Sequence, residues 1–151
     1  MEQMLALVPT PIGVGPRYQP PPAIHAPCTN APLQTGTRMH LELFANRFAV
    51  VIPARIGVRG KSCRAGIWTT EPTGVIRFAR RATLGDLFAV WGTPLSATRL
   101  LSFRGPVWIF RNGRRLRGDP RLVPLVAGDE VVLEVGGYIP PHRSYRFAPD
   151  H

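Results

Sequence analysis

Proline decides which parts of this chain can form a helix. Eight of the 17 prolines fall within residues 1–37, and three of them, at positions 20–22, are consecutive. Proline lacks the amide hydrogen and has a fixed φ, so no helix can persist through this segment, which also lacks the alternation of a strand. We therefore predict an extended, proline-rich N-terminal arm over residues 1–37. One folded domain with a C-terminal tail should follow over residues 38–151.

Beyond residue 37 the hydrophobic pattern is that of short strands. Apolar and polar side chains alternate over residues 39–45, which is typical of a strand with one buried face. Further strands are predicted at residues 48–53, 66–70, 75–79, 107–111, 114–117 and 131–135. Glu71-Pro72-Thr73-Gly74 and Asn112-Gly113 have the residues of tight turns, so each should join two neighbouring strands into a hairpin.

One helix is predicted, between Thr83 and Gly92. Thr83 is a good N-cap, Asp86 can complete a capping box with it, and Gly92 suits the end of a helix. Between them, apolar side chains recur at helical spacing and should face the core: Leu84, Leu87, Phe88 and Trp91. The order of strands, one helix and more strands favours an α+β fold in which the helix lies across a mixed or antiparallel sheet.

Three stretches resemble the second half of the ubiquitin-like β-grasp proteins, and the sulfur carriers of thiamine and molybdopterin biosynthesis in particular. They are "TLGDLFAVWG", "VWIFRNGRRL" and "LVAGDEVVLEVGG", within residues 83–137. This resemblance implies a β-grasp sheet with one main helix. A sulfur carrier is activated at the carboxylate of a terminal glycine, whereas Gly136-Gly137 is followed here by residues 138–151. We therefore expect these glycines to be a hinge at the end of the last strand, with Tyr138, Tyr145 and Phe147 packing back on the sheet.

A second resemblance covers residues 28–149. "MHLELFANRFAVVIPARIGV", "GVIRFARRATLGDLFAVWGTPL" and "VPLVAGDEVVLEVGG" are similar to a group of uncharacterised, mostly exported bacterial proteins. Their pattern runs His-x-His-Leu, Ile-Pro-Ala-x-Ile-Gly, Leu-His-Thr-His-Asp, Gly-Ile-Ile-His and a Thr-Leu-Gly helix ending in Trp-Gly. The resemblance implies an extracytoplasmic or secreted protein, although the first residues of the sequence as given do not read as a signal peptide.

The histidines of that pattern would suit a transition metal, because imidazole is its commonest protein ligand. In this chain their positions hold Arg38, His40, Trp68, Thr70 and Arg77, with Glu71 at the acid. One imidazole and one carboxylate do not make a tight site. We therefore predict no metal and no cofactor, with Trp68 packed and Arg77 solvated in a plain hairpin.

The remaining histidines and nucleophiles give no catalytic pattern. His25, His142 and His151 lie in the arm or the tail and are expected to be solvated. Ser62-Cys63 has no histidine nearby in the sequence. We predict that the chain is not an enzyme.

The two cysteines, Cys28 and Cys63, match no zinc-binding spacing. They could be free thiols in a cytosolic protein, or one disulfide that fastens the arm to the domain. We predict the disulfide, because the arm has little else to anchor it. No apolar run is long enough for a transmembrane helix.

A net charge of +10, carried by 18 arginines and one lysine, is compatible with a polyanionic partner. Candidate contacts are Arg77, Arg80 and Arg81, then Arg111, Arg114, Arg115, Arg117 and Arg121, with Trp108 and Phe110 between them. The alternative is a GC-rich genome, in which arginine codons displace lysine codons, and the spread of arginine along the chain favours it.

These observations predict a small, non-enzymatic, extracytoplasmic binding or structural module. Its partner would be an unknown protein or a component of the cell envelope. The alternative function is binding of a polyanion, either nucleic acid or an acidic polysaccharide, through the arginine-rich faces.

Overall fold

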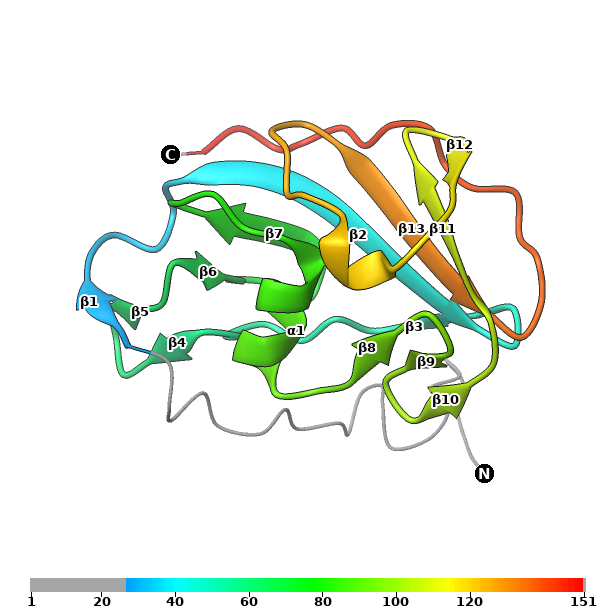
Figure 1. Ribbon diagram of the computed structural model, residues 1–151. Helices are drawn as coiled ribbons and strands as arrows, with labels where there is room; N and C mark the ends of the chain where they lie inside the picture. The colour runs from blue at the N-terminus through cyan, green and yellow to red at the C-terminus, as the bar shows by residue number, and fades with distance from the viewer. Residues whose placement is uncertain (1–26, 151) are drawn as a thin grey trace, which may run out of the picture.

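The computed structural model describes residues 27–150, so residues 1–26 of the predicted arm, and His151, lie outside the described residues. Within this range the chain is mostly β, with one short α-helix and several sheets (Figure 1). None of the described helices is long and apolar enough to cross a membrane.

A seven-stranded mixed sheet forms the centre of the fold. In spatial order it contains β12 (Arg114–Leu116), β11 (Val107–Arg111), β13 (Glu130–Val135), β2 (Thr37–Ala45), β7 (Val75–Phe78) and β6 (Ile67–Trp68), while β3 (Phe48–Val50) also pairs with β2. The two central strands, β2 and β13, are parallel, and the other pairs are antiparallel. The sheet therefore has the first long strand and the last strand side by side in its middle.

Two small antiparallel sheets lie beside the central one. The first contains β1 (Thr29–Asn30), β5 (Cys63–Arg64) and β4 (Val58–Arg59), and the second contains β10 (Phe103–Arg104), β9 (Arg99–Leu100) and β8 (Leu95–Ser96). The sequence did not predict these six strands, because two-residue pairings are too short to show a hydrophobic period.

The helix α1 (Leu84–Trp91) has the predicted bounds and caps. Thr83 accepts from the backbone amide of Asp86, the Asp86 carboxylate accepts from the backbone amide of Thr83, and Gly92 ends the helix with φ 83°. The four apolar residues predicted to face the core are buried. A short 3₁₀ turn, η1 (Pro120–Leu122), lies against α1.

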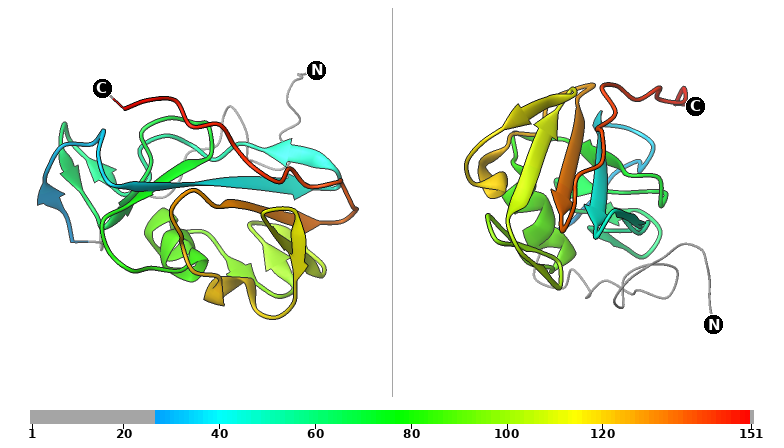
Figure 2. Two further views of the ribbon diagram at one scale, coloured as in Figure 1. Left: turned by 90° about the horizontal axis from the view of Figure 1, so that it is seen from above. Right: turned by 90° about the vertical axis from the view of Figure 1, so that its right-hand side faces the viewer.

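The two faces of the central sheet are covered differently. Alternate residues of β2 and β13, such as Leu41, Leu43 and Leu133, join α1 in the hydrophobic core. We call the opposite face the outer face, and Figure 2 shows the last residues of the chain running across it, on the side away from α1. We call residues 138–150 the C-terminal tail. Its direction follows from Gly136 and Gly137, whose φ values of 79° and 142° turn the chain at the end of β13, as predicted.

The hairpin around residues 71–74 forms as predicted, between β6 and β7. Trp68 is fully buried, which confirms the expectation for it, and its Nε1–H donates to the carbonyl oxygen of Leu33 at 2.9 Å. The expectation that Arg77 is solvated is wrong. Its side chain is buried, because it pairs with Asp150 of the C-terminal tail, a residue 73 positions away.

The disulfide between Cys28 and Cys63 is present. Next to it, Thr29 and Asn30 pair with Arg64 and Cys63 in the small sheet of β1, β5 and β4. The described end of the predicted arm is therefore attached to the domain by a covalent bond and by strand pairing together.

Removing this disulfide should destabilise the fold. The Cys28→Ser/Cys63→Ser double variant should lose about 3–4 kcal/mol of unfolding free energy in urea, because the bond closes a loop of 35 residues and limits the unfolded chain. Alkylation followed by mass measurement should find no free thiol in the wild-type protein. Two alkylated cysteines, or equal stability of the variant, would contradict the prediction.

Candidate functional site

The parallel register of β2 and β13 brings ionisable side chains together on the outer face. His40 lies opposite Glu130, and Glu42 follows His40 by two residues on the same face. His40 and Glu130 are both buried, with 4% and 0% of their surface exposed. His142 of the C-terminal tail adds a second imidazole beside Glu42. We call these four residues, His40, Glu42, Glu130 and His142, the His–Glu cluster.

The imidazole of His40 is held in one orientation. Its Nε2 lies 2.7 Å from the carbonyl oxygen of Thr73, in the turn between β6 and β7. A carbonyl oxygen only accepts, so Nε2 carries the proton and Nδ1 faces the carboxyl groups. The ring of Tyr145 stacks on His40 with centroids 3.5 Å apart and planes at 8°. The ring is therefore fixed by a hydrogen bond at one edge and by an aromatic face above it.

Glu130 is the most buried carboxyl group of the His–Glu cluster. Its Oε1 lies 2.6 Å from Nδ1 of His40, and it also hydrogen-bonds the carboxyl group of Glu42. Burial raises the pKa of Glu130 to about 7; the hydrogen bond with His40 opposes this rise and the neighbouring Glu42 adds to it. Within the described chain, no N–H or O–H donor reaches Oε2 of Glu130. Two carboxyl groups in contact require a proton or a cation between them.

Glu42 connects the buried part of the cluster to solvent. Nδ1 of His142 lies 3.0 and 2.9 Å from the two carboxyl oxygens of Glu42. Burial acts to raise the pKa of Glu42, but the hydrogen bonds with Glu130 and His142 outweigh it, so the pKa is lowered. The hydrogen bond with Glu42 raises the pKa of His142, whose ring is mostly exposed.

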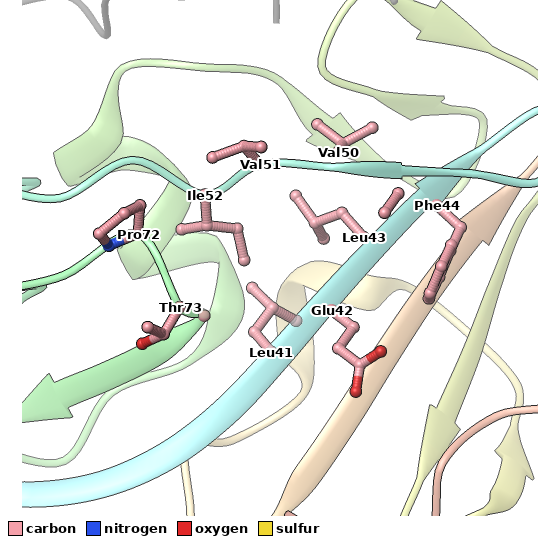
Figure 3. A pocket seen from close by; sticks show the side chains of 11 residues that line it. Leu41, Glu42, Leu43, Phe44, Val50, Val51, Ile52, Pro72 and Thr73 are labelled. Carbon is pink, nitrogen blue, oxygen red and sulfur yellow. The ribbon is translucent and has the colours of Figure 1, made fainter. Parts of the chain in front are cut away.

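An apolar groove adjoins the cluster. It has a volume of about 230 Å³ and is lined by residues 41–44 of β2, residues 49–52 and the turn at residues 72–74. The groove lies where β2 changes its partner from β7 to β3. Figure 3 shows Glu42 on β2 at the border of this groove, with its carboxyl group directed away from Val51 and Ile52. The side chain of Glu42 is 18% exposed, so a small ion can reach its carboxyl group from solvent.

The C-terminal tail is fixed at its far end by two arginines. Arg77 donates to Asp150 through two nitrogens, at 2.7 and 3.1 Å, and to Thr35 and Gln34 at 2.9 Å each. Arg38 donates to the carbonyl oxygen of Ala148 at 2.6 Å. These contacts hold the tail over the cluster.

A second buried carboxyl group, Glu134, lies four residues further along β13 on the same face. The amide of Ile139 donates to its Oε1 at 3.0 Å, and no donor among the described residues reaches its Oε2. Burial raises the pKa of Glu134, and the hydrogen bond from Ile139 only partly opposes this. Glu134 is part of the buried outer face but lies outside the His–Glu cluster.

The arginines proposed from the sequence as polyanion contacts separate into different environments. Arg77 is buried and pairs with Asp150, Arg111 pairs with Asp129, and Arg121 pairs with Asp119. The positive charge of these three arginines is therefore already paired with a carboxylate and is not free to bind a polyanion. Of the others, Arg80 and Arg81 follow β7, whereas Arg114, Arg115 and Arg117 lie on or just after β12. Three strands of the central sheet separate β7 from β12, so the two groups do not form one surface.

Aromatic side chains lie next to the arginines at β12. The guanidinium of Arg115 lies 3.7 Å from the ring centroid of Trp108, and the ring of Tyr138 lies 6.4 Å from Trp108. Trp108 and Tyr138 are exposed. The expected combination of arginine with interleaved aromatic rings is therefore present at this one edge, although Phe110 is buried.

The sequence did not identify Glu42, Glu130 or His142 as members of one site. His40 and Glu42 were visible as neighbours on one strand face, but Glu130 is 90 residues from His40 and His142 is 100 residues from Glu42. No protein-family model, no curated protein and no solved structure matches this chain. The resemblances noted in the sequence therefore stay predictions.

Glu134 gives a testable pH dependence. Its folded-state pKa lies above the ordinary value of 4.5, so the folded protein binds the proton more tightly, and the free energy of unfolding falls as pH rises above that value. Glu134→Gln stays neutral, so it should stabilise the protein at about pH 8 and change little at about pH 4. Urea denaturation at both pH values measures this.

Glu71→Gln is the control, because Glu71 is exposed in a turn. It should change the unfolding free energy by less than about 0.5 kcal/mol at either pH. A Glu134→Gln variant that is less stable than wild type at about pH 8 would show that the charged carboxylate is favourable in the folded protein.

Proposed function

We propose that this protein is a non-enzymatic binding module that works outside the cytoplasm and binds polyanions. The observation that carries the proposal is the stack of Arg115 on exposed Trp108 at the β12 edge of the sheet. Exposed aromatic rings beside guanidinium groups that have no carboxylate partner among residues 27–150 suit a chain of phosphates or sulfates with stacked rings between them. The net charge of +10 would attract such a ligand from a distance.

Three arginines form the proposed contact surface. Arg114, Arg115 and Arg117 are exposed on or just after β12. Arg115 lies opposite Phe110 in the register, so it is on the outer face with Trp108, and Arg117 follows it by two residues. A guanidinium can bind a phosphate or sulfate oxygen pair in a bidentate manner while its plane stays on an indole ring.

We also propose that the central sheet is of the β-grasp type. The first long strand and the last strand are its parallel centre, an antiparallel strand flanks each of them, and α1 connects the two halves. In this interpretation β2, β7, β11, β12 and β13 are the five strands of the motif, and β3–β6 are an insertion between the first two. The strand order and the single crossing helix support it.

The disulfide supports a location outside the cytoplasm. Disulfides persist in oxidising compartments and are rare in the reducing cytosol. Because both cysteines are used in this bond, neither is a thiolate nucleophile, which is in keeping with a binding function.

Salt dependence of binding tests the proposal. Heparin and single-stranded DNA should bind at about 50 mM salt, and the affinity should fall steeply as salt increases. Arg115→Glu/Arg117→Glu should reduce the slope of log K against log salt by about 1–2, since each phosphate contact contributes about 0.7–0.9. Fluorescence anisotropy and heparin affinity chromatography provide the measurements.

Arg80→Glu/Arg81→Glu is the matched control. It changes the net charge by the same amount just after β7, which three strands of the central sheet separate from β12, so its slope should stay near that of the wild type. Equal losses in the two variants would indicate attraction by net charge alone, and no binding at about 50 mM salt would refute the proposal.

A further inference from the structure

We propose that the His–Glu cluster binds one divalent transition-metal ion, of which Zn²⁺ is the representative, and that this ion clamps the C-terminal tail to the sheet. The ligands would be Nδ1 of His40 and carboxylate oxygens of Glu42 and Glu130 from the sheet, with Nδ1 of His142 from the tail. The sequence-based expectation of no metal paired His40 only with Glu71. It did not consider the carboxylates and the second imidazole that the fold brings to His40.

The first argument is the orientation of His40. A histidine that binds a metal through one nitrogen typically donates its other N–H to a carbonyl or carboxylate, which fixes the tautomer. Nε2 of His40 donates to the carbonyl of Thr73 at 2.7 Å, so the lone pair of Nδ1 points at Glu130 and Glu42. Tyr145 stacks on the same ring and prevents it from turning. These supporting contacts are those of a preorganised metal ligand.

The second argument is the unsatisfied charge of the carboxyl groups. Glu130 is fully buried, it contacts the carboxyl group of Glu42, and its Oε2 receives no donor from the described residues. A buried carboxylate oxygen that accepts no hydrogen bond is costly. A single proton neutralises only one of the two carboxylates. A divalent cation would neutralise both and could also bind Oε2 of Glu130.

The third argument is distance. One ligand atom from each of His40, Glu42 and Glu130 can be chosen so that all three lie within 4.8 Å of one another. His142 is outside this group of three, although its Nδ1 lies 2.9 Å from Glu42, so its mostly exposed ring would move inward to become the fourth ligand. Ligand atoms around a tetrahedral Zn²⁺ are about 3.3–3.6 Å apart, since each is about 2.0–2.2 Å from the ion. The 2.6 Å contact between His40 and Glu130 would therefore open by about 1 Å as the ion replaces the proton between them.

The ligand set and its access define the class of ion. Two imidazole nitrogens and two carboxylates, with no thiolate, suit Zn²⁺, Co²⁺, Fe²⁺ or Mn²⁺ better than Cu⁺. His142 is mostly exposed and Glu42 lines the groove, so an ion can enter without unfolding the sheet. Because His142 belongs to the tail and the other ligands to the sheet, a bound ion would cross-link them.

Metal titration of the full chain tests the proposal. After dialysis against chelator, the wild type should take up one Zn²⁺ per chain in calorimetry and in elemental analysis of the gel-filtered protein. Co²⁺ in its place should give the visible absorption of a low-coordinate site with nitrogen and oxygen ligands. His142→Ala and Glu130→Gln should each weaken Zn²⁺ binding by about 10- to 100-fold or more.

Glu134→Gln is the matched control for Glu130→Gln. Both residues are buried on the outer face of β13, but Glu134 is outside the cluster, so its variant should bind Zn²⁺ like the wild type. His142→Ala changes an exposed side chain, so loss of binding in that variant cannot be attributed to unfolding. An absence of binding, or unchanged affinity in either cluster variant, would overturn the proposal.

Trypsin digestion tests the clamp separately. Arg143 and Arg146 are exposed cleavage sites in the tail, on either side of Tyr145. Zn²⁺ should slow cleavage at both sites in the wild type and have no such effect in His142→Ala. Equal cleavage of the wild type with and without Zn²⁺ would refute the clamp.

Discussion

The parallel pairing of β2 and β13 is the contact on which the rest of the structure depends. It joins the first long strand to the last across 90 residues and forms the centre of the sheet. One side of this pair supplies Leu41, Leu43 and Leu133 to the core under α1. The other side places His40 against Glu130. The core and the candidate site therefore lie on opposite faces of the same strand pair, so a shift in the register of β2 against β13 would change both.

The elements with local signals were predictable from the sequence. The helix depends on Thr83, Asp86 and Gly92, which lie within ten residues, and the hairpins depend on turn residues beside alternating strands. The register of β2 on β13 has no such local signal. No turn connects these strands, and a shift of two residues would keep the same faces buried, so the pairing of His40 with Glu130 could not be derived. The burial of Arg77 was missed for the same reason, since its partner Asp150 is 73 residues away.

The outer face shows how a fold can bury polar groups without losing order. Each buried group there has at least one specific partner: His40 has Thr73 and Glu130, Arg77 has Asp150, and Glu134 has the amide of Ile139. Such networks specify one arrangement, because a displaced tail would leave several charged groups buried and unpaired. An apolar tail would cover the sheet with less electrostatic cost, but it could slide along it. Polar contacts at both ends of the tail fix its position.

Arg77 has a consequence for the topology of the whole chain. Its guanidinium binds Gln34 and Thr35 just ahead of the first long strand and Asp150 at the end of the described tail, so the segment that leads into β2 and the end of the tail meet at one side chain. The path from residue 34 to residue 150 is therefore nearly a closed ring. A chain that passes one point twice can be rejoined at that point and opened elsewhere, so a short linker between residues 34 and 150 would permit circular permutation of the part from residue 34 onward, with new ends in an exposed turn.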